Sequence, residues 1–168
     1  MTAPTSVSTA LERVDYGNPA GSIQLGQHRQ VIKEGVATRQ LTAKESGALC
    51  CYDRAAGVVY TLPTPVAGMY FEFIVTTAVT SNAHKVITKT VASDFLVGGI
   101  IMGDVTVAQS GDFFEADGTT HVALSAAGST TGGLLGERYV VTAISSTQWA
   151  IHGVCHGAGT LATPFATS

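Results

Sequence analysis

The residues best suited to bind a metal form a histidine and cysteine group near the C-terminus. His152, Cys155 and His156 place nitrogen and sulfur donors at close spacing, as a zinc site requires. Either residue of the Cys50-Cys51 pair could supply a fourth ligand. A structural zinc site usually has a second clear donor pair, which this sequence lacks. We therefore expect His152 on a strand, the other two in its glycine-flanked exit, and no metal.

Three acidic residues offer the oxygen ligands that calcium prefers. Asp112, Glu115 and Asp117 precede Gly118, but their spacing does not fit the known calcium-binding loop. Such clusters usually solvate a turn. We expect neither a metal nor any cofactor.

Short motifs that would mark an enzyme are also missing. The sequence contains no Gly-x-Ser-x-Gly elbow and no phosphate-binding loop ending in Gly-Lys-Ser/Thr. Residues 157–162 match a relaxed dinucleotide fingerprint, but they follow the last expected strand, precede no expected helix and end at Pro164, so the strand-turn-helix context of that motif is missing. No particular histidine and carboxylate are brought together by the sequence. We predict no catalytic residues and no enzymatic activity.

The composition predicts that much of the protein's surface is buried against partners. Hydrophobic residues make up 45% of the 168 residues and charged residues only 12%, about half the usual share of roughly 25%. The basic residues are scattered and the net charge is -3, so we expect no nucleic-acid partner. No apolar run approaches the roughly 18 residues that span a membrane. The three cysteines are expected to be reduced, and the protein to be made in a cytoplasm.

The spacing of β-branched and aromatic runs predicts an all-β fold. After residue 38, short apolar runs alternate with Gly, Pro, Asn and Asp every 8 to 12 residues or so, which is typical of a β-sandwich or a small jelly-roll-like barrel. We expect an extended N-terminal arm over residues 1–38 and a β-sandwich domain with a short C-terminal tail over residues 39–168. The expected strands are 48–53, 58–62, 69–77, 85–90, 95–102, 104–109, 121–125, 138–144 and 148–154.

Two hairpins and one two-sided strand are predicted within this domain. Gly57 can close a hairpin over residues 49–62, and residues 145–147 turn the chain into a second hairpin. Along Tyr70–Val75, alternation places Phe71 and Phe73 on one face, while Tyr70 and Ile74 make the other face unusually apolar. The residues expected in the core sheet or an oligomer contact are Tyr70, Phe71, Phe73, Ile74 and Trp149.

A resemblance to known proteins covers residues 40 to 90. The run Leu41-Thr42-Ala43-Lys44-Glu45-Ser46-Gly47-Ala48-Leu49, then Asp53-Arg54-Ala55-Ala56-Gly57 and Thr61-Leu62-Pro63, is followed by an aromatic strand at Tyr70–Phe73 and by Thr80-Ser81-Asn82-Ala83-His84-Lys85. This pattern resembles small virion proteins of tailed phages, in particular head decoration (cement) proteins.

The resemblance implies a structural role on the outside of a capsid. Its expected partners are the major capsid protein and further copies of the chain, with a homotrimer as the expected oligomer. The arm would grip neighbouring capsid subunits. A tail or fibre protein with a receptor-binding or carbohydrate-binding β-domain is the alternative. The residues expected in the capsid-contact arm are Tyr16, Asn18, Pro19, Ile23, Leu25, Val31 and Ile32.

Overall fold

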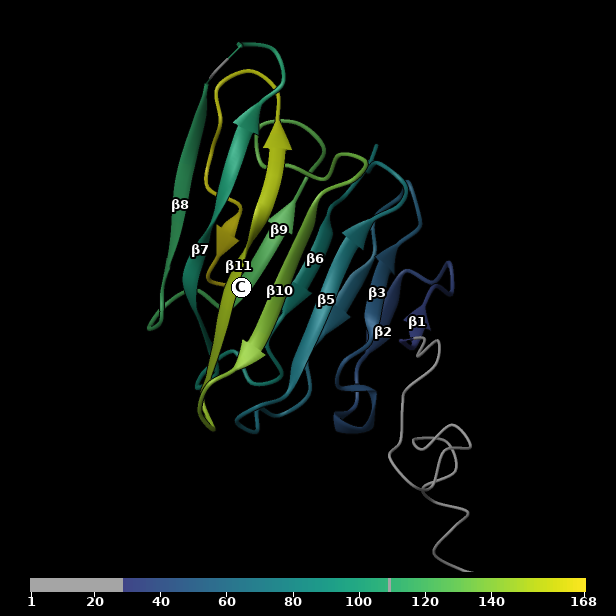
Figure 1. Cartoon of the computed structure of the whole chain (residues 1–168), viewed down its shortest axis with the longest axis vertical. Helices are drawn as coiled ribbons and strands as arrows, with labels where there is room; N and C mark the ends of the chain where they lie inside the picture. The colour runs from purple at the N-terminus through teal and green to yellow at the C-terminus, as the bar shows by residue number, and fades with distance from the viewer. Residues whose placement is uncertain (1–28, 109) are drawn as a thin grey trace, which may run out of the picture.

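A computed structural model, which describes residues 29–108 and 110–168, shows two β-sheets packed face to face (Figure 1). One sheet has seven strands and the other five. In these residues the single helical element is a short 3-10 turn at Ala43–Glu45. The prediction of an all-β, two-sheet fold with little helix is confirmed. The part of the chain that the structure describes contains no helix long and apolar enough to cross a membrane.

Each sheet mixes parallel and antiparallel neighbours. In spatial order, the seven-stranded sheet consists of β1 (Val31–Ile32), β3 (Leu49–Tyr52), β5 (Tyr70–Val75), β10 (Arg138–Ala143), β11 (Gln148–Gly157), β7 (Phe95–Asp104) and β8 (Gly111–Asp117). The five-stranded sheet consists of β12 (Phe165–Ala166), β9 (Ala123–Ala126), β6 (His84–Ile87), β4 (Val59–Thr61) and β2 (Thr38–Gln40).

The first six strands wind as a flattened coil. Odd-numbered strands β1, β3 and β5 lie parallel in the seven-stranded sheet, and even-numbered strands β2, β4 and β6 lie parallel in the other. The chain therefore crosses between the sheets at every turn and advances by one strand per coil. Parallel neighbours require such crossovers, because a tight hairpin can join only antiparallel strands.

This winding overturns the predicted hairpin over residues 49–62. Strands β3 and β4 belong to different sheets and do not pair. Gly57 has the expected positive φ of 84°, but the turn passes the chain to the opposite sheet. A Cβ atom at Gly57 would come within 2.5 Å of the Ala83 carbonyl oxygen, so only glycine allows this close approach.

The C-terminal half is built from antiparallel hairpins. Strands β10 and β11 form the second predicted hairpin, with Ala143 opposite Trp149 beside the turn. Strands β7 and β8 form another. The hairpins join side by side because β11 runs parallel to β7 over ten residues.

Strand β8 was not predicted, whereas a strand at residues 104–109 was. The structure ends β7 at Asp104, whose carboxylate Oδ1 accepts hydrogen bonds from the backbone N–H of Thr106 at 2.7 Å and from its hydroxyl at 2.6 Å. A carboxylate that bonds the backbone two residues later turns the chain. The β-branched residues after Asp104 therefore lie in the connection, and β8 begins at Gly111.

Both ends of the described chain join the sheets. Strands β1 and β2 lie within or across the segment expected as an arm, so the chain is in the sandwich from Val31 onward. The expected C-terminal tail contains β12, which pairs with β9 and buries Phe165. The backbone of Pro164 also contributes, since its carbonyl accepts a hydrogen bond from the Ser125 N–H at 2.7 Å.

An aromatic cluster fills the core between the sheets. Phe73 stacks on Tyr139 with ring centroids 5.3 Å apart, and Tyr52 lies 5.9 Å from Phe73. The hydroxyls of Tyr52 and Tyr139 are 2.6 Å apart and satisfy each other's hydrogen bond. Tyr60 completes the group from the five-stranded sheet. Removing these large apolar surfaces from water stabilises the fold by roughly 25 cal/mol for each Å² that is buried. This burial holds the two layers together.

Candidate assembly surface

The outer face of the seven-stranded sheet is the surface that faces away from the five-stranded sheet. Because side chains alternate along a strand, residues of β5 divide cleanly: Phe71 and Phe73 are fully buried in the core, whereas Tyr70 is 44% exposed. The same alternation on β11, β7 and β8 points every second side chain outward. This outer face carries both exposed apolar side chains and an ion cluster.

Three exposed apolar side chains stand in one line across the outer face. Val154 of β11 is opposite Ile101 of β7, and Ile101 is opposite Phe113 of β8. They are 59%, 57% and 64% exposed, respectively. We call these three residues the apolar row. Neighbouring exposed apolar side chains of this kind are typical of protein contact surfaces.

Gly99 makes room for the phenylalanine of the apolar row. A Cβ atom on Gly99 would lie 2.4 Å from the ring of Phe113. The missing side chain therefore lets the Phe113 ring lie over the backbone of β7. The ring contacts the backbone of β7 at Gly99, and Phe113 as a whole is 64% exposed.

An ion cluster lies on the same face beside the apolar row. The carboxylate of Glu72, which is 6% exposed, accepts hydrogen bonds from Arg29 and Arg138. Arg29 also donates to the Gly47 carbonyl oxygen at 3.0 Å, so it ties the start of the described chain to the turn before β3 and, through Glu72, to β5. Arg138 of β10 lies opposite Val154, so this charged side chain occupies the position next to the apolar row.

The two arginines set the protonation of Glu72. Burial alone would raise the pKa of its carboxyl, but the hydrogen bonds from Arg138 and Arg29 and their positive charges outweigh burial and hold the pKa below its ordinary value of 4.5. A carboxyl whose pKa is lowered on folding stabilises the fold above its unfolded pKa. That contribution is lost as the pH falls through the folded pKa.

We therefore expect Glu72→Gln to reduce the loss of stability in acid. The wild type should lose thermal stability between about pH 5 and pH 2 more steeply than the variant, because only the wild type loses this ion cluster. Thermal melts monitored by circular dichroism across that range measure the difference. Parallel melting curves for the two proteins would show that the cluster contributes nothing.

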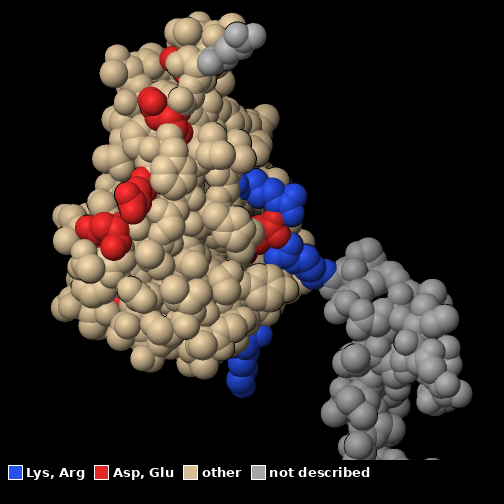
Figure 2. All heavy atoms as spheres, turned by 60° about the vertical axis from the view of Figure 1, so that its left-hand side comes forward, with Lys and Arg blue, Asp and Glu red and all other residues tan. Residues whose placement is uncertain are grey.

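The end of the sheet at β7 and β8 is acidic. No Lys or Arg occurs between Lys89 and Arg138, and the exposed or half-buried carboxylates there belong to Asp104, Asp112, Glu115 and Asp117. Figure 2 turns this side forward and shows separate acidic side chains on a surface that is mostly uncharged, with basic side chains grouped around an acidic one on the right.

The acidic residues do not combine into a cation site. Asp117 is committed to its own turn: its carboxylate accepts hydrogen bonds from the N–H groups of Thr119 at 2.9 Å and Thr120 at 2.8 Å. Bonds from the Thr120 side chain and these N–H groups hold its pKa well below the ordinary value. Asp112 and Glu115 are an odd number of residues apart on β8, so their side chains leave opposite faces of the sheet.

The histidine and cysteine group is also divided between faces. His152 is exposed on the outer face, whereas Cys155 points into the core. Within the described residues, no three His, Cys, Asp or Glu side chains are placed to share a metal ion. Cys50 is fully buried, and burial raises the pKa of its thiol to about 12.

Glu137 is the most deeply buried carboxylate near this group. It accepts hydrogen bonds from the backbone N–H of Gly133 at 2.8 Å, Leu134 at 3.0 Å and His156 at 3.3 Å. Burial raises its pKa even though these bonds oppose the shift. Its position and partners identify it as the centre of the turn that leads into β10.

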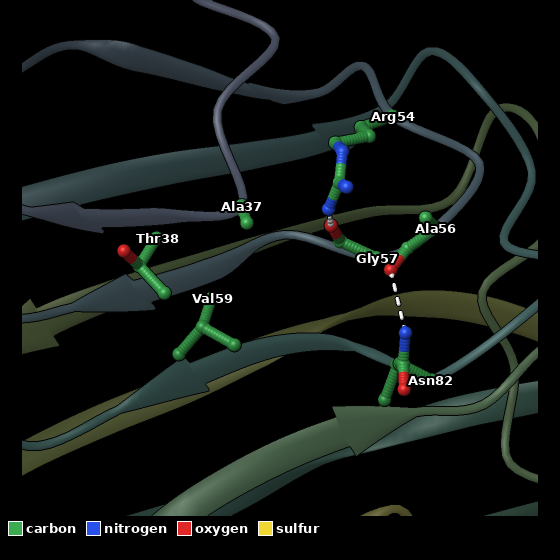
Figure 3. Close-up of a pocket in the computed structure, with 8 residues that line it drawn as sticks. Ala37, Thr38, Arg54, Ala56, Gly57, Val59 and Asn82 are labelled. Carbon is green, nitrogen blue, oxygen red and sulfur yellow. Dashed lines mark hydrogen bonds between the residues drawn. The ribbon is translucent and has the colours of Figure 1, made fainter.

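A shallow hollow lies at one end of the five-stranded sheet, with a volume of about 310 Å³. Figure 3 shows Arg54 turned back toward the Gly57 carbonyl oxygen and Asn82 bonded to the Ala56 carbonyl oxygen. The polar groups thus bond to the protein's own backbone. Its lining contains no aromatic side chain on which a sugar could stack.

The structure separates the predicted site residues into core and surface. Phe71, Phe73 and Trp149 are completely buried, as a core role requires, while Tyr70 and half-buried Ile74 lie on the outer face. In the predicted arm, Val31 is 56% exposed and Ile32 is buried, and both belong to β1. The remaining arm residues lie outside the described residues: Tyr16, Asn18, Pro19, Ile23 and Leu25.

Sequence reasoning missed the apolar row. Ile101 was placed in a predicted strand, but its side chain was not assigned to either face of the sheet. Phe113 lay in no predicted strand. The signal was present in Asp112-Phe113-Phe114-Glu115, where two aromatic residues between charges indicate an edge strand with one side chain inward and one outward. Arg29 and Arg138 could not have been paired with Glu72 from the sequence, because that contact depends on strand order.

Comparison with known proteins adds no relative. No family model matches the chain, and neither a search of curated proteins nor a search of solved structures finds a match.

Proposed function

We propose that the protein is a non-catalytic structural protein that assembles with other protein surfaces, and that it decorates the outside of a tailed-phage capsid. The observation that carries the assembly role is the apolar row of Val154, Ile101 and Phe113, which leaves three neighbouring apolar side chains more than half exposed. The capsid is suggested by the sequence resemblance over residues 40 to 90. The outer face of the seven-stranded sheet is the proposed docking surface.

The charges of the outer face suit repeated docking on a shell. The three charges of the ion cluster are paired with one another, because Glu72 is shared by Arg29 and Arg138, and the cluster keeps a net charge of +1. An already paired charge is less costly to cover than a free one. Each contact is modest in size, and a shell with many equivalent sites raises the net hold through avidity.

The hydrogen bonds of three carboxylates in the described residues favour this role over catalysis. Glu72 is committed to arginines, Glu137 to backbone amides and Asp117 to its own turn. None of the three is free to exchange a proton with a substrate. The tail-fibre alternative needs an aromatic platform for a sugar, and the exposed aromatic rings of Tyr70 and Phe113 stand on different rows of the sheet.

Replacing the apolar row with serine tests the proposal. The triple variant Ile101→Ser, Phe113→Ser and Val154→Ser should lose about 3 kcal/mol of binding energy if each side chain contributes about 1 kcal/mol on burial, which is about a 100-fold loss of affinity. Co-sedimentation with capsids of the phage that encodes the chain measures it.

Exposed valines elsewhere provide the matched control. Val66 and Val91 are 58% and 48% exposed and lie outside the sheets, so the double variant Val66→Ser and Val91→Ser should bind as the wild type does. A folded triple variant that binds capsids with wild-type affinity would refute the proposed docking surface. Wild-type protein that fails to bind at all would refute the capsid role.

A further inference from the structure

The seven-stranded sheet ends in β8, whose far backbone edge has no neighbouring strand in the described chain. The Gly118 N–H donates to the Leu96 carbonyl oxygen, and the Asp104 N–H donates to the Ser110 carbonyl oxygen, each at 2.9 Å. Antiparallel ladders bond through alternate residues. The even-numbered residues of β8 therefore face β7, and Phe113 and Glu115 direct their N–H and C=O groups outward.

The opposite edge of the sheet, at β1, likewise has no neighbouring strand in the described chain. The Leu49 N–H donates to the Gln30 carbonyl oxygen at 2.9 Å, so Gln30 and Ile32 bond toward β3. Val31 between them directs its own N–H and C=O away from the sheet. Its side chain, 56% exposed, lies on the outer face, as does that of Phe113.

Charge distinguishes the partners that each edge would accept. Strand β8 contains three carboxylates and no basic residue, whereas β1 is flanked by Arg29 and Lys33. Pairing two β8 edges would gather six carboxylates and no basic residue on neighbouring strands, and this repulsion is unfavourable. Pairing β8 with β1 brings opposite charges together.

We propose that copies of this chain assemble head to tail, by antiparallel pairing of β8 of one copy with β1 of the next. This inference rests on the proposed structural role and names its partner at the sheet edges. Following the pairings across the sheet, β8 runs opposite to β1. A copy placed edge to edge in the same orientation therefore presents the antiparallel direction.

One register of the β8–β1 pair matches the outward backbone groups, the apolar side chains and the opposite charges of the two strands. With Phe113 opposite Val31, both residues have outward backbone groups and side chains on the outer face. The same register places Glu115 opposite Arg29 and Gly111 opposite Lys33. The apolar row then gains Val31 of the next copy, and the sheet continues from copy to copy. A head-to-tail contact closes into a ring or extends as a filament, depending on its rotation angle.

Two proline variants test the pairing, since each removes one outward N–H group and leaves the other edge intact. Phe113→Pro blocks β8 and Val31→Pro blocks β1, and proline is tolerated on an edge strand. Sedimentation velocity should show wild-type oligomers, and each variant alone as a monomer of 17.3 kDa. An equimolar mixture should form a dimer, because the β1 edge of the first variant fits the β8 edge of the second.

The controls Phe113→Leu and Val31→Ile keep both amides and should assemble as the wild type does. Circular dichroism checks the fold of each variant, and Phe113→Lys with Val31→Lys replaces the pair if a proline variant unfolds, since edge lysines also oppose strand pairing. A Val31→Pro protein that still dimerises would overturn the proposal in favour of β8 self-pairing. A mixture that stays monomeric would also overturn it.

Capsids are absent from this experiment, so its failure is separate from failure of the proposed function. A wild type that is monomeric at every concentration yet binds capsids would overturn the head-to-tail inference and leave the capsid role standing. Oligomers that follow the mixing pattern but bind no capsid would support the edge pairing and count against the capsid role.

Discussion

Replacing Phe73 with alanine is expected to lower the free energy of unfolding by about 3–5 kcal/mol, the range for removing a buried phenylalanine. Phe73 is fully buried and contacts Tyr52, Tyr60 and Tyr139 from both sheets. Its loss would leave a cavity where the two layers meet. Urea unfolding followed by tyrosine and tryptophan fluorescence measures the change.

The neighbouring residue Ile74 provides the control. It lies one position along β5 with its side chain on the outer face and is half-buried. Ile74→Ala should therefore cost about 1 kcal/mol, in proportion to the smaller apolar area that it covers. Equal losses for the two variants would contradict the alternation of faces on which the assembly surface depends.

Replacing Glu137 with methionine is expected to cost about 3 kcal/mol. The substitution leaves the buried N–H group of Gly133 and the partly buried N–H group of Leu134 without their acceptor, and each unsatisfied buried donor costs about 1–3 kcal/mol. The N–H of His156 also loses its partner. Chemical denaturation measures the loss, and it should exceed that of Glu115→Met, since Glu115 lies on the exposed edge strand.

A glutamine at the same position sharpens this test. Glu137→Gln keeps one acceptor oxygen and the side-chain length, so it should recover part of the stability that methionine loses. Glutamine and methionine variants of equal stability would show that the carboxylate does not hold the turn. The structure predicts the order wild type, glutamine, methionine.

The fold class followed from features that are local in the sequence. Alternation along Tyr70–Val75 reflects burial of one face of a strand, and the turn residues before Trp149 close a hairpin whose strands are adjacent in the chain. Such contacts join residues that are close in sequence, and the pattern of side chains records them directly. These predictions were confirmed at the level of faces and partners.

The strand order could not be predicted, because it depends on contacts between distant segments. Residues 49–62 have the sequence pattern of a hairpin, yet the two strands that they form belong to different sheets. The deciding contact is the close approach of Gly57 to the backbone of Ala83, which lies 26 positions further on. The ion cluster is a second case, since it joins residues 29, 72 and 138 through strand order alone.

The candidate surface was missed for a related reason. The low charge led to the prediction that partners cover part of the surface, but it did not say which part. The apolar row exists only when β11, β7 and β8 are in register, and β8 itself begins after a turn set by Asp104 and Thr106. A short segment with three charged residues and a glycine start has a weak strand signal.

Electron cryo-microscopy of capsids incubated with the protein would show directly whether it decorates the shell. Added density is expected at symmetry-related positions on the outside of the shell, with Val154, Ile101 and Phe113 facing capsid subunits. Density attached through the five-stranded sheet, or shells that carry none at saturating protein, would contradict this expectation.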